Sequence, residues 1–219
     1  MAREPTKLNL REQAYETIRG QILAGEYSPD TLLSENGLAG LLGFSRTPIR
    51  EAIRDLAKAG LVDVLPKRGI VVRGVSATDI LEVFQIREVL EGLAVKIAIG
   101  RLTDADIEAM ESDHARSVSS AGKGKKREAF DHAVKMHQHI RAACNNHRLD
   151  AIMHTLDDQV HQLGLMTLAI PGRLEKALAE HDGIIKAIRT RNTEKAEKLM
   201  IEHLQLDREA AIRQRTPAR

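Results

Sequence analysis

Residues 34–61 read SENGLAGLLGFSRTPIREAIRDLAKAGL, and they indicate the fold of the N-terminal third more clearly than any other segment. Serines, which favour the N-cap position, stand before two apolar periodic segments; this predicts a short helix over about 34–42 and a second over 45–58. Gly43 separates the two helices. Pro48 falls in the first turn of the second helix, where its missing N–H costs little. The pattern is typical of a helix-turn-helix.

The second of these helices has one basic face. Arg46, Arg50 and Arg54 stand four residues apart, so they project from the same side. Ile49 and Ile53 lie on another side, which is apolar and suited to a core. A solvated helix face usually mixes both signs of charge, whereas the sequence places only arginines on this one. We therefore expect the face to meet an anion.

The flanking segments complete a small domain around the helix-turn-helix, which we place at about 34–57. Apolar residues spaced by four predict a first helix over about 10–23. Two apolar runs on either side of the tip PKRG at 66–69 predict a β-hairpin, or wing, over about 61–73. Three helices followed by a hairpin make a winged helix-turn-helix domain, which we expect over residues 8–75.

A basic helix of this kind fits the major groove of double-stranded DNA, with its N-terminal residues nearest the base edges. Arginine bonds two acceptors of a guanine at once, and Ser and Thr hydroxyls reach phosphates. A surface helix with solvated arginines is the alternative, but it does not explain why a turn, a basic helix and a basic wing occur together. We predict DNA contacts from Ser45, Arg46, Thr47, Arg50 and Arg54 on the helix and from Lys67 and Arg68 at the wing tip.

The segment LLSENGLAGLLGFSRTPIREAIRDLAKAGLV at 32–62 resembles the DNA-binding signature of GntR-family bacterial transcription regulators, above all in SRTPIREA and LAKAGLV. Leu33 stands where the family pattern has Pro, and Asn36 stands where Arg is common. The resemblance implies that three more residues belong to the DNA-binding surface: Ser34, Glu35 and the wing glycine Gly69.

Beyond the wing, the sequence pattern is helical and contains no period-two segment long enough to predict a strand. Asn, Gly and Pro residues punctuate it at intervals. We expect an all-helical bundle over residues 78–213, built from helices at about 77–99, 103–118, 126–144, 148–168, 172–190 and 193–213.

Polar side chains interrupt the apolar faces of four of these helices. Arg87 lies on the inner face of the first, where it needs an anion: either Glu91 one turn later or the carboxylate of a ligand. His137, His181 and His203 each stand at the middle of another apolar face. One such histidine alone is usually a satisfied core residue, but three beside an arginine favour a cavity with converging polar groups. We predict that these five residues bind an effector.

Neutral imidazoles are ligands for Zn, Ni and other divalent metals, and three of them leave coordination positions open for a small carboxylate. We therefore expect either a metal held by His137, His181 and His203 or an effector bound without metal. The other histidines lie outside the apolar faces and are expected to face solvent: His114, His132, His139, His147, His154 and His161.

The C-terminal two thirds resemble the all-helical effector-binding (FCD-like) domain of FadR-type GntR regulators. The segments that carry the resemblance are IREVLEGLAVKIA at 86–98, MHQHIRAACNNHRL at 136–149 and EHDGIIKAIRTRNTEKAEKLMIEHL at 180–204. In metal-containing members an Asp four residues before the first histidine completes the site, whereas this chain has Ala133 there. The resemblance also implies a homodimer that binds a two-fold symmetric operator, which is the physical default for helix-turn-helix proteins.

Composition sets the cellular context of these predictions. Apolar residues make up 42% and charged residues 29% of the 219 residues, with a net charge of +2, as in ordinary globular proteins. The single cysteine, Cys144, cannot form an internal disulfide, and the N-terminus lacks the apolar run of a signal peptide. No uninterrupted apolar stretch is long enough to span a membrane. We expect a cytoplasmic protein with no membrane partner.

Together these features predict a ligand-responsive transcription regulator rather than an enzyme: a repressor of a metabolic operon that a small carboxylate releases from DNA. One alternative is a helical metallohydrolase that uses the three histidines, although the core faces carry no evident catalytic carboxylate apart from Glu91. Another is a constitutive DNA-binding dimer with no effector.

Overall fold

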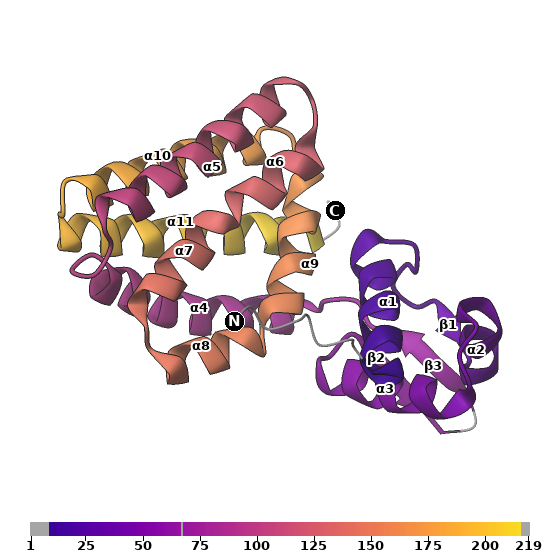
Figure 1. Ribbon diagram of the computed structural model, residues 1–219. Helices are drawn as coiled ribbons and strands as arrows, with labels where there is room; N and C mark the ends of the chain where they lie inside the picture. Colours follow the sequence, from indigo (N-terminus) through magenta and orange to yellow (C-terminus); the bar gives the residue numbers. More distant parts are fainter. Residues whose placement is uncertain (1–8, 67, 216–219) are drawn as a thin grey trace. The chain divides into compact units, whose positions relative to one another are not determined.

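The computed structural model describes residues 9–66 and 68–215 of the chain. Contacts divide the chain into two compact units, with the boundary along the sequence between Val75 and Ser76. The first unit combines helices with a small sheet, and the second is helical wherever regular structure occurs in its described residues (Figure 1). The predicted fold class, mainly α with an N-terminal winged helix-turn-helix, is confirmed.

The first unit begins with a helix that is capped as its sequence dictates. The Asn9 side chain accepts a hydrogen bond from the Glu12 amide at 2.9 Å, and the Glu12 carboxylate accepts one from the Asn9 amide at 3.0 Å. At the other end Gly25 takes the left-handed conformation, with φ of 80°. The elements of this unit are α1 (Leu10–Ala24), β1 (Leu32–Leu33), α2 (Glu35–Leu42), α3 (Arg46–Lys58), β2 (Val62–Leu65) and β3 (Gly69–Val72).

Aliphatic side chains from α1, α3 and the sheet form the core of the first unit. Ile18 of α1 packs with Ile49 and Leu56 of α3, and all three are fully buried. Ile70 and Val72 of β3 face the same core. The apolar side of α3 is thereby fixed inward, so its arginine side faces out.

The strands form an antiparallel sheet in the order β1-β3-β2. Leu65 pairs with Gly69 beside the hairpin turn, which gives the predicted wing. Leu33 of β1 pairs with Ile70, so β1 adds a strand that the sequence does not predict. Two residues are too few for a period-two pattern, and β1 exists only because its backbone pairs with β3.

The second unit is a helical bundle in which α4 packs most extensively against α11, while α5 packs against α6 and α10 (Figure 1). Its helices are α4 (Ala77–Ala98), α5 (Asp104–Gly122), α6 (Lys126–Ala133), α7 (Lys135–Cys144), α8 (His147–His154), α9 (Asp157–Leu168), α10 (Arg173–Arg189) and α11 (Thr193–Arg215).

Two helices that the sequence predicts as continuous are broken. The expected helix 126–144 bends at Val134, where α6 ends and α7 begins. The expected helix 148–168 is interrupted at Thr155 and Leu156, whose amides bond to carbonyls only three residues earlier, in a tightened last turn. No Gly or Pro marks either place, so the sequence gives no warning. The expected helix 103–118 instead continues to Gly122.

Most of the largest fully buried side chains of the second unit are aliphatic. Ile80 and Phe84 of α4, Ile107 of α5, and Ile184 and Ile188 of α10 are almost completely buried. Among the described residues, no helix has the length and apolarity needed to cross a membrane.

Candidate nucleic-acid interface and histidine site

The N-terminal end of α3 carries the predicted arginines. The sequence of α3 alone predicts a surface with only positive charge there, but the structure adds a negative charge. Glu35 of α2 lies beside it, with Oε2 placed 3.3 Å from Nε of Arg50 and 3.8 Å from Nη2 of Arg46. The side chains of Arg46 and Arg50 remain 62% and 50% exposed. Glu35 therefore holds the two guanidinium groups together while both stay accessible to a ligand such as DNA.

The serines at the starts of α2 and α3 play different parts. The Ser34 hydroxyl accepts a hydrogen bond from the Gly37 amide at 3.0 Å, so it caps α2. Ser45 occupies the N-cap position of α3, but its hydroxyl makes no capping bond to the helix, contrary to expectation. Ser45 and Thr47 are both exposed, which leaves their hydroxyls free to reach phosphates.

The remaining predicted DNA contacts lie on α3 and the wing. Arg54 is exposed one turn beyond Arg50, and Arg68 is exposed at the wing tip. Lys67 falls outside the described residues. Gly69 has φ of 112°, and a Cβ there would lie 3.0 Å from the Leu33 carbonyl oxygen. This glycine is therefore needed to bring β1 against the wing, a structural role that the resemblance does not reveal.

In the second unit the three predicted histidines converge from α7, α10 and α11. Nε2 of His181 lies 3.4 Å from Nε2 of His137 and 3.1 Å from Nε2 of His203. His181 and His203 are buried, and the His137 side chain is only 16% exposed. The fold therefore brings together the three histidines that the sequence pattern identifies.

Two carboxylates orient these rings from behind. Glu91 lies 2.5 Å from Nδ1 of His137, and Glu180 lies 2.7 Å from Nδ1 of His203. A carboxylate accepts the Nδ1–H of such a ring, which leaves the Nε2 lone pair pointing inward. Nδ1 of His181 is buried and has no hydrogen-bond partner.

Burial and charge set the ionisation of these groups. Burial and the neighbouring His203 and His137 lower the pKa of His181 well below its ordinary value, so the ring is neutral. Burial acts to raise the pKa of Glu91, but Arg87 and His137 outweigh it and hold that pKa far below its ordinary range. The site thus combines ionised carboxylates with a neutral central imidazole.

Two buried arginines frame the same site. Arg87 donates to Glu91 at 2.7 Å, which is one of the two partners that the sequence predicts for it. Arg173 lies 2.7 Å from both Glu180 and Asp207. Arg173 is not predicted from the sequence, because it stands in the first turn of α10, outside the apolar periodicity that identifies the other polar core residues. Its position directly after Pro171 and Gly172, where α10 begins, gives no sign of burial.

A small cavity of about 60 Å³ opens between these groups. Arg87, Arg173 and the three histidines line it, together with Ala133 and apolar residues of α9 and α10. At about 10–15 Å³ for each ordered water, the cavity has room for a few water molecules, or for an ion with part of its hydration shell.

The donor set fits a divalent metal. Two nitrogen ligands at about 2.0–2.1 Å from one ion stand roughly 3 Å apart, which agrees with the observed Nε2 spacings. The ligand atoms of His137, His181 and His203 all lie within 4.8 Å of one another. Ala133 offers no ligand atom, and Asp131 is exposed and paired with Arg127. A metal here would therefore have three protein ligands and open positions.

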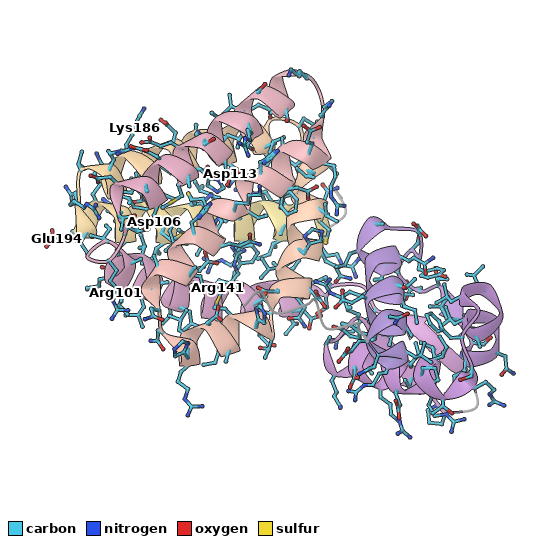
Figure 2. All side chains as sticks on the ribbon, viewed as in Figure 1. Arg101, Asp106, Asp113, Arg141, Lys186 and Glu194 are labelled. Atoms are coloured by element: carbon cyan, nitrogen blue, oxygen red, sulfur yellow. The ribbon has the colours of Figure 1, made fainter. Side chains whose placement is uncertain are left out.

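The expectation that six other histidines face solvent is only partly correct. His147 and His154 are exposed, whereas the other four are half-buried: His114, His132, His139 and His161. Asp113, which Figure 2 labels on α5, lies 3.1 Å from both Nε2 of His139 and Nζ of Lys135. His132 on α6 and His139 on α7 are partly covered because both helices also pack on α5.

Comparison with known families agrees with both units. Residues 82–206 match the FCD domain family, and residues 10–72 match the family described as "Bacterial regulatory proteins, gntR family". Together the two matches span nearly all of the described residues.

Curated relatives extend over most of this chain. "Uncharacterized HTH-type transcriptional regulator YdhC" of Bacillus subtilis is 27% identical over 89% of this chain and 88% of its own length. "HTH-type transcriptional repressor GlaR" of Escherichia coli is also 27% identical, over 87% and 90%. The "Probable D-xylose utilization operon transcriptional repressor" of Paenarthrobacter nicotinovorans is 28% identical, over 91% and 87%.

Solved structures share the fold. "E. coli McbR/YncC" superposes with a TM-score of 0.81 at 22% identity, covering 96% of this chain and all of that one. A putative transcriptional regulator GntR from Rhodococcus superposes with a TM-score of 0.77 at 22% identity, covering 95% and 99%.

Proposed function

This chain belongs to the GntR family of bacterial regulatory proteins and carries an FCD domain, and from this we propose that it is a ligand-responsive repressor. Its domains and its relatives are those of transcription regulators, so it is a transcription regulator and not an enzyme. We propose that a small carboxylate enters the histidine cavity and releases the protein from the operator of a metabolic operon. The observation that carries the proposal is the convergence of two buried arginines and three histidines on one cavity.

At the DNA, Arg46 and Arg50 would read base edges from the N-terminal end of α3. Glu35 restrains both guanidinium groups, and a restrained donor pair loses less conformational entropy when it meets a base. Ser45, Thr47 and the wing would contact the phosphate backbone. We propose that the protein binds a two-fold symmetric operator as a homodimer, in the cytoplasm, where bacterial DNA lies.

In the cavity, His137, His181 and His203 would hold a divalent metal such as Zn or Ni. Bound there, such a metal supplies a Lewis-acidic centre with open coordination positions. Glu91 and Glu180 would orient two of the ligating rings through their Nδ1 atoms.

The charges around the cavity favour an anionic effector once a metal is present. Arg87 and Arg173 face the three carboxylates of Glu91, Glu180 and Asp207, which leaves one excess negative charge when the imidazoles are neutral. A divalent cation reverses that excess to one positive charge, which a monocarboxylate would neutralise. We infer that metal binding precedes and strengthens carboxylate binding.

Repression is proposed because two of the relatives described above are named repressors. Release of DNA requires that the effector bind the DNA-free arrangement more tightly than the DNA-bound one, with a coupling free energy of about 1–3 kcal/mol. Binding to both arrangements with equal affinity would release nothing.

A thermal-shift screen tests the proposal. Full-length protein is heated with two- to six-carbon carboxylates, with and without Zn or Ni, and a ligand should raise the unfolding midpoint through mass action. Arg87→Met should abolish the ligand-induced rise. Arg189→Met should preserve it, because Arg189 pairs with Glu111 on α5 rather than lining the cavity. No stabilisation by any carboxylate or metal would favour the alternative of a constitutive DNA-binding dimer.

A further inference from the structure

The outer face of α4 carries an apolar stripe that the bundle does not cover. Ile86, Val89 and Leu93 are 41%, 68% and 41% exposed, although the opposite face of the same helix is buried. Their spacing of three and four residues aligns them on one side of the helix. Exposed aliphatic residues that share one helix face mark an interaction site more often than isolated ones do.

Opposite charges flank the stripe symmetrically. Glu82 lies seven residues before Val89 and Lys96 lies seven residues after it, so both stand two turns from the centre of the stripe on the same side of α4. Both are exposed. Lys96 also pairs with Glu197 of α11 at 3.3 Å, yet its side chain stays 57% exposed. The face is therefore apolar at its centre, acidic at one end and basic at the other.

We propose that this face binds a second copy of the chain, with α4 packed antiparallel against α4 of the partner around a two-fold axis at Val89. In that register Glu82 of each copy lies opposite Lys96 of the other, so two ion pairs flank the apolar contact. A two-fold axis parallel to the helices would instead oppose glutamate to glutamate and lysine to lysine. Like charges placed opposite each other disfavour that parallel arrangement. The inference rests on the proposed homodimer and names the face that forms it.

The length of α4 agrees with binding to a two-fold operator. Ser76, the N-cap of α4, lies thirteen residues before Val89, which is about 20 Å along the axis. In the antiparallel pair the two copies of Ser76 are therefore about 39 Å apart along the helix axes. Half-sites one turn apart on DNA are separated by roughly 34–36 Å. The chain thus enters each copy of α4 at a spacing suited to successive major grooves.

Charge reversal tests the register. Sedimentation equilibrium is measured for the wild type, Glu82→Lys, Lys96→Glu, the double variant Glu82→Lys/Lys96→Glu and a control. Each single reversal should raise the dimer dissociation constant at least about tenfold, because it creates two like-charge contacts, and the double variant should restore it. The control is Lys186→Glu, on the outer surface of α10 (Figure 2), which should change nothing.

Disulfide trapping tests the axis without relying on stability. Val89→Cys should form a covalent dimer on mild oxidation, because residues on the axis face their own copies within disulfide reach. Glu82→Cys should not, since its two copies would lie about 21 Å apart. The native Cys144 is buried, so wild-type protein serves as the blank.

The outcomes separate this inference from the proposed function. A monomeric wild type would overturn both the homodimer and the α4 face. A dimer that neither charge reversal weakens, or that cross-links as readily through position 82 as through position 89, would overturn the α4 register while leaving the homodimer intact. Weakening by both single variants, rescue by the double variant and selective trapping at position 89 would establish it.

Discussion

Nε2 of His181 lies 3.1 Å from Nε2 of His203 in the core of the second unit. When the His203 ring is neutral and its Nδ1 donates to Glu180, its Nε2 presents a lone pair, and His181 must place its own ring hydrogen on Nε2 to bond with it. Nδ1 of His181, which has no hydrogen-bond partner, is then an unpaired buried acceptor. A metal ion held by these rings would accept the Nε2 lone pairs of both His181 and His203, so neither Nε2 would have to donate to the other.

We expect His181→Ala to remove the metal. Wild-type protein supplemented with Zn or Ni should carry about one metal ion per chain by elemental analysis, and the variant should carry almost none. His154→Ala is the matched control, because His154 is exposed and should leave the metal content unchanged. Wild-type protein that retains no metal after supplementation would rule out the metal site.

Arg50→Ala should weaken operator binding by about 1–3 kcal/mol and relax the choice of base at one position. Fluorescence anisotropy with a duplex selected from a random library, compared with unselected DNA, measures this effect. Arg54→Ala, one turn further along α3, should weaken both duplexes alike. If Arg50→Ala also weakens both equally, Arg50 contacts phosphate rather than a base.

Glu35→Gln should lower sequence specificity without lowering overall affinity. The change removes a negative charge from the proposed DNA-facing surface and releases Arg46 and Arg50 from their shared partner. Affinity for unselected DNA should therefore rise, and the ratio of specific to non-specific binding should fall. Binding isotherms at several salt concentrations separate these effects. An unchanged ratio would mean that Glu35 does not position the arginines.

Asp113→Asn should destabilise the second unit at neutral pH by about 1–3 kcal/mol, through loss of charge-assisted hydrogen bonds. Burial acts to raise the pKa of Asp113, but hydrogen bonds from His139 and Lys135 outweigh it and lower that pKa. A carboxyl with a lowered native pKa stabilises the protein above its unfolded pKa of about 3.9, and this stability is lost as pH falls below it.

Urea unfolding of both forms from pH 7 to pH 3 measures that linkage. The difference between wild type and variant should be constant down to about pH 4 and shrink below it. A difference that stays constant to pH 3 would contradict the assigned ionisation of Asp113.

Local sequence signals predict the first unit well. Gly43, the Ser34 cap and the apolar spacing of α3 specify a helix-turn-helix, because each acts within a few residues of its own position. β1 escapes prediction because its strand structure depends on pairing with β3, far along the chain. Glu35 escapes as the partner of Arg50 for the same reason, since the contact joins two helices.

In the second unit, too, local signals are predicted from the sequence and contacts between distant segments are not. The histidines are found because each interrupts an apolar periodicity within its own helix. Arg173 is missed because its burial depends on acids supplied two turns further along α10 and by α11. The bend at Val134 is not predicted because no Gly or Pro marks it. The contact of His139 with Asp113 of α5 is therefore not predicted either.

If the cavity controls DNA binding, a titration that follows release of DNA should reveal it. Metal-loaded protein bound to a labelled duplex selected in vitro is titrated with the carboxylate that stabilises it most, and anisotropy is followed. The dissociation constant for DNA should rise at least about fivefold, and this rise should be lost in Arg87→Met and kept in Arg189→Met. A carboxylate that saturates the cavity and leaves the affinity for DNA unchanged would contradict control of DNA binding by the cavity.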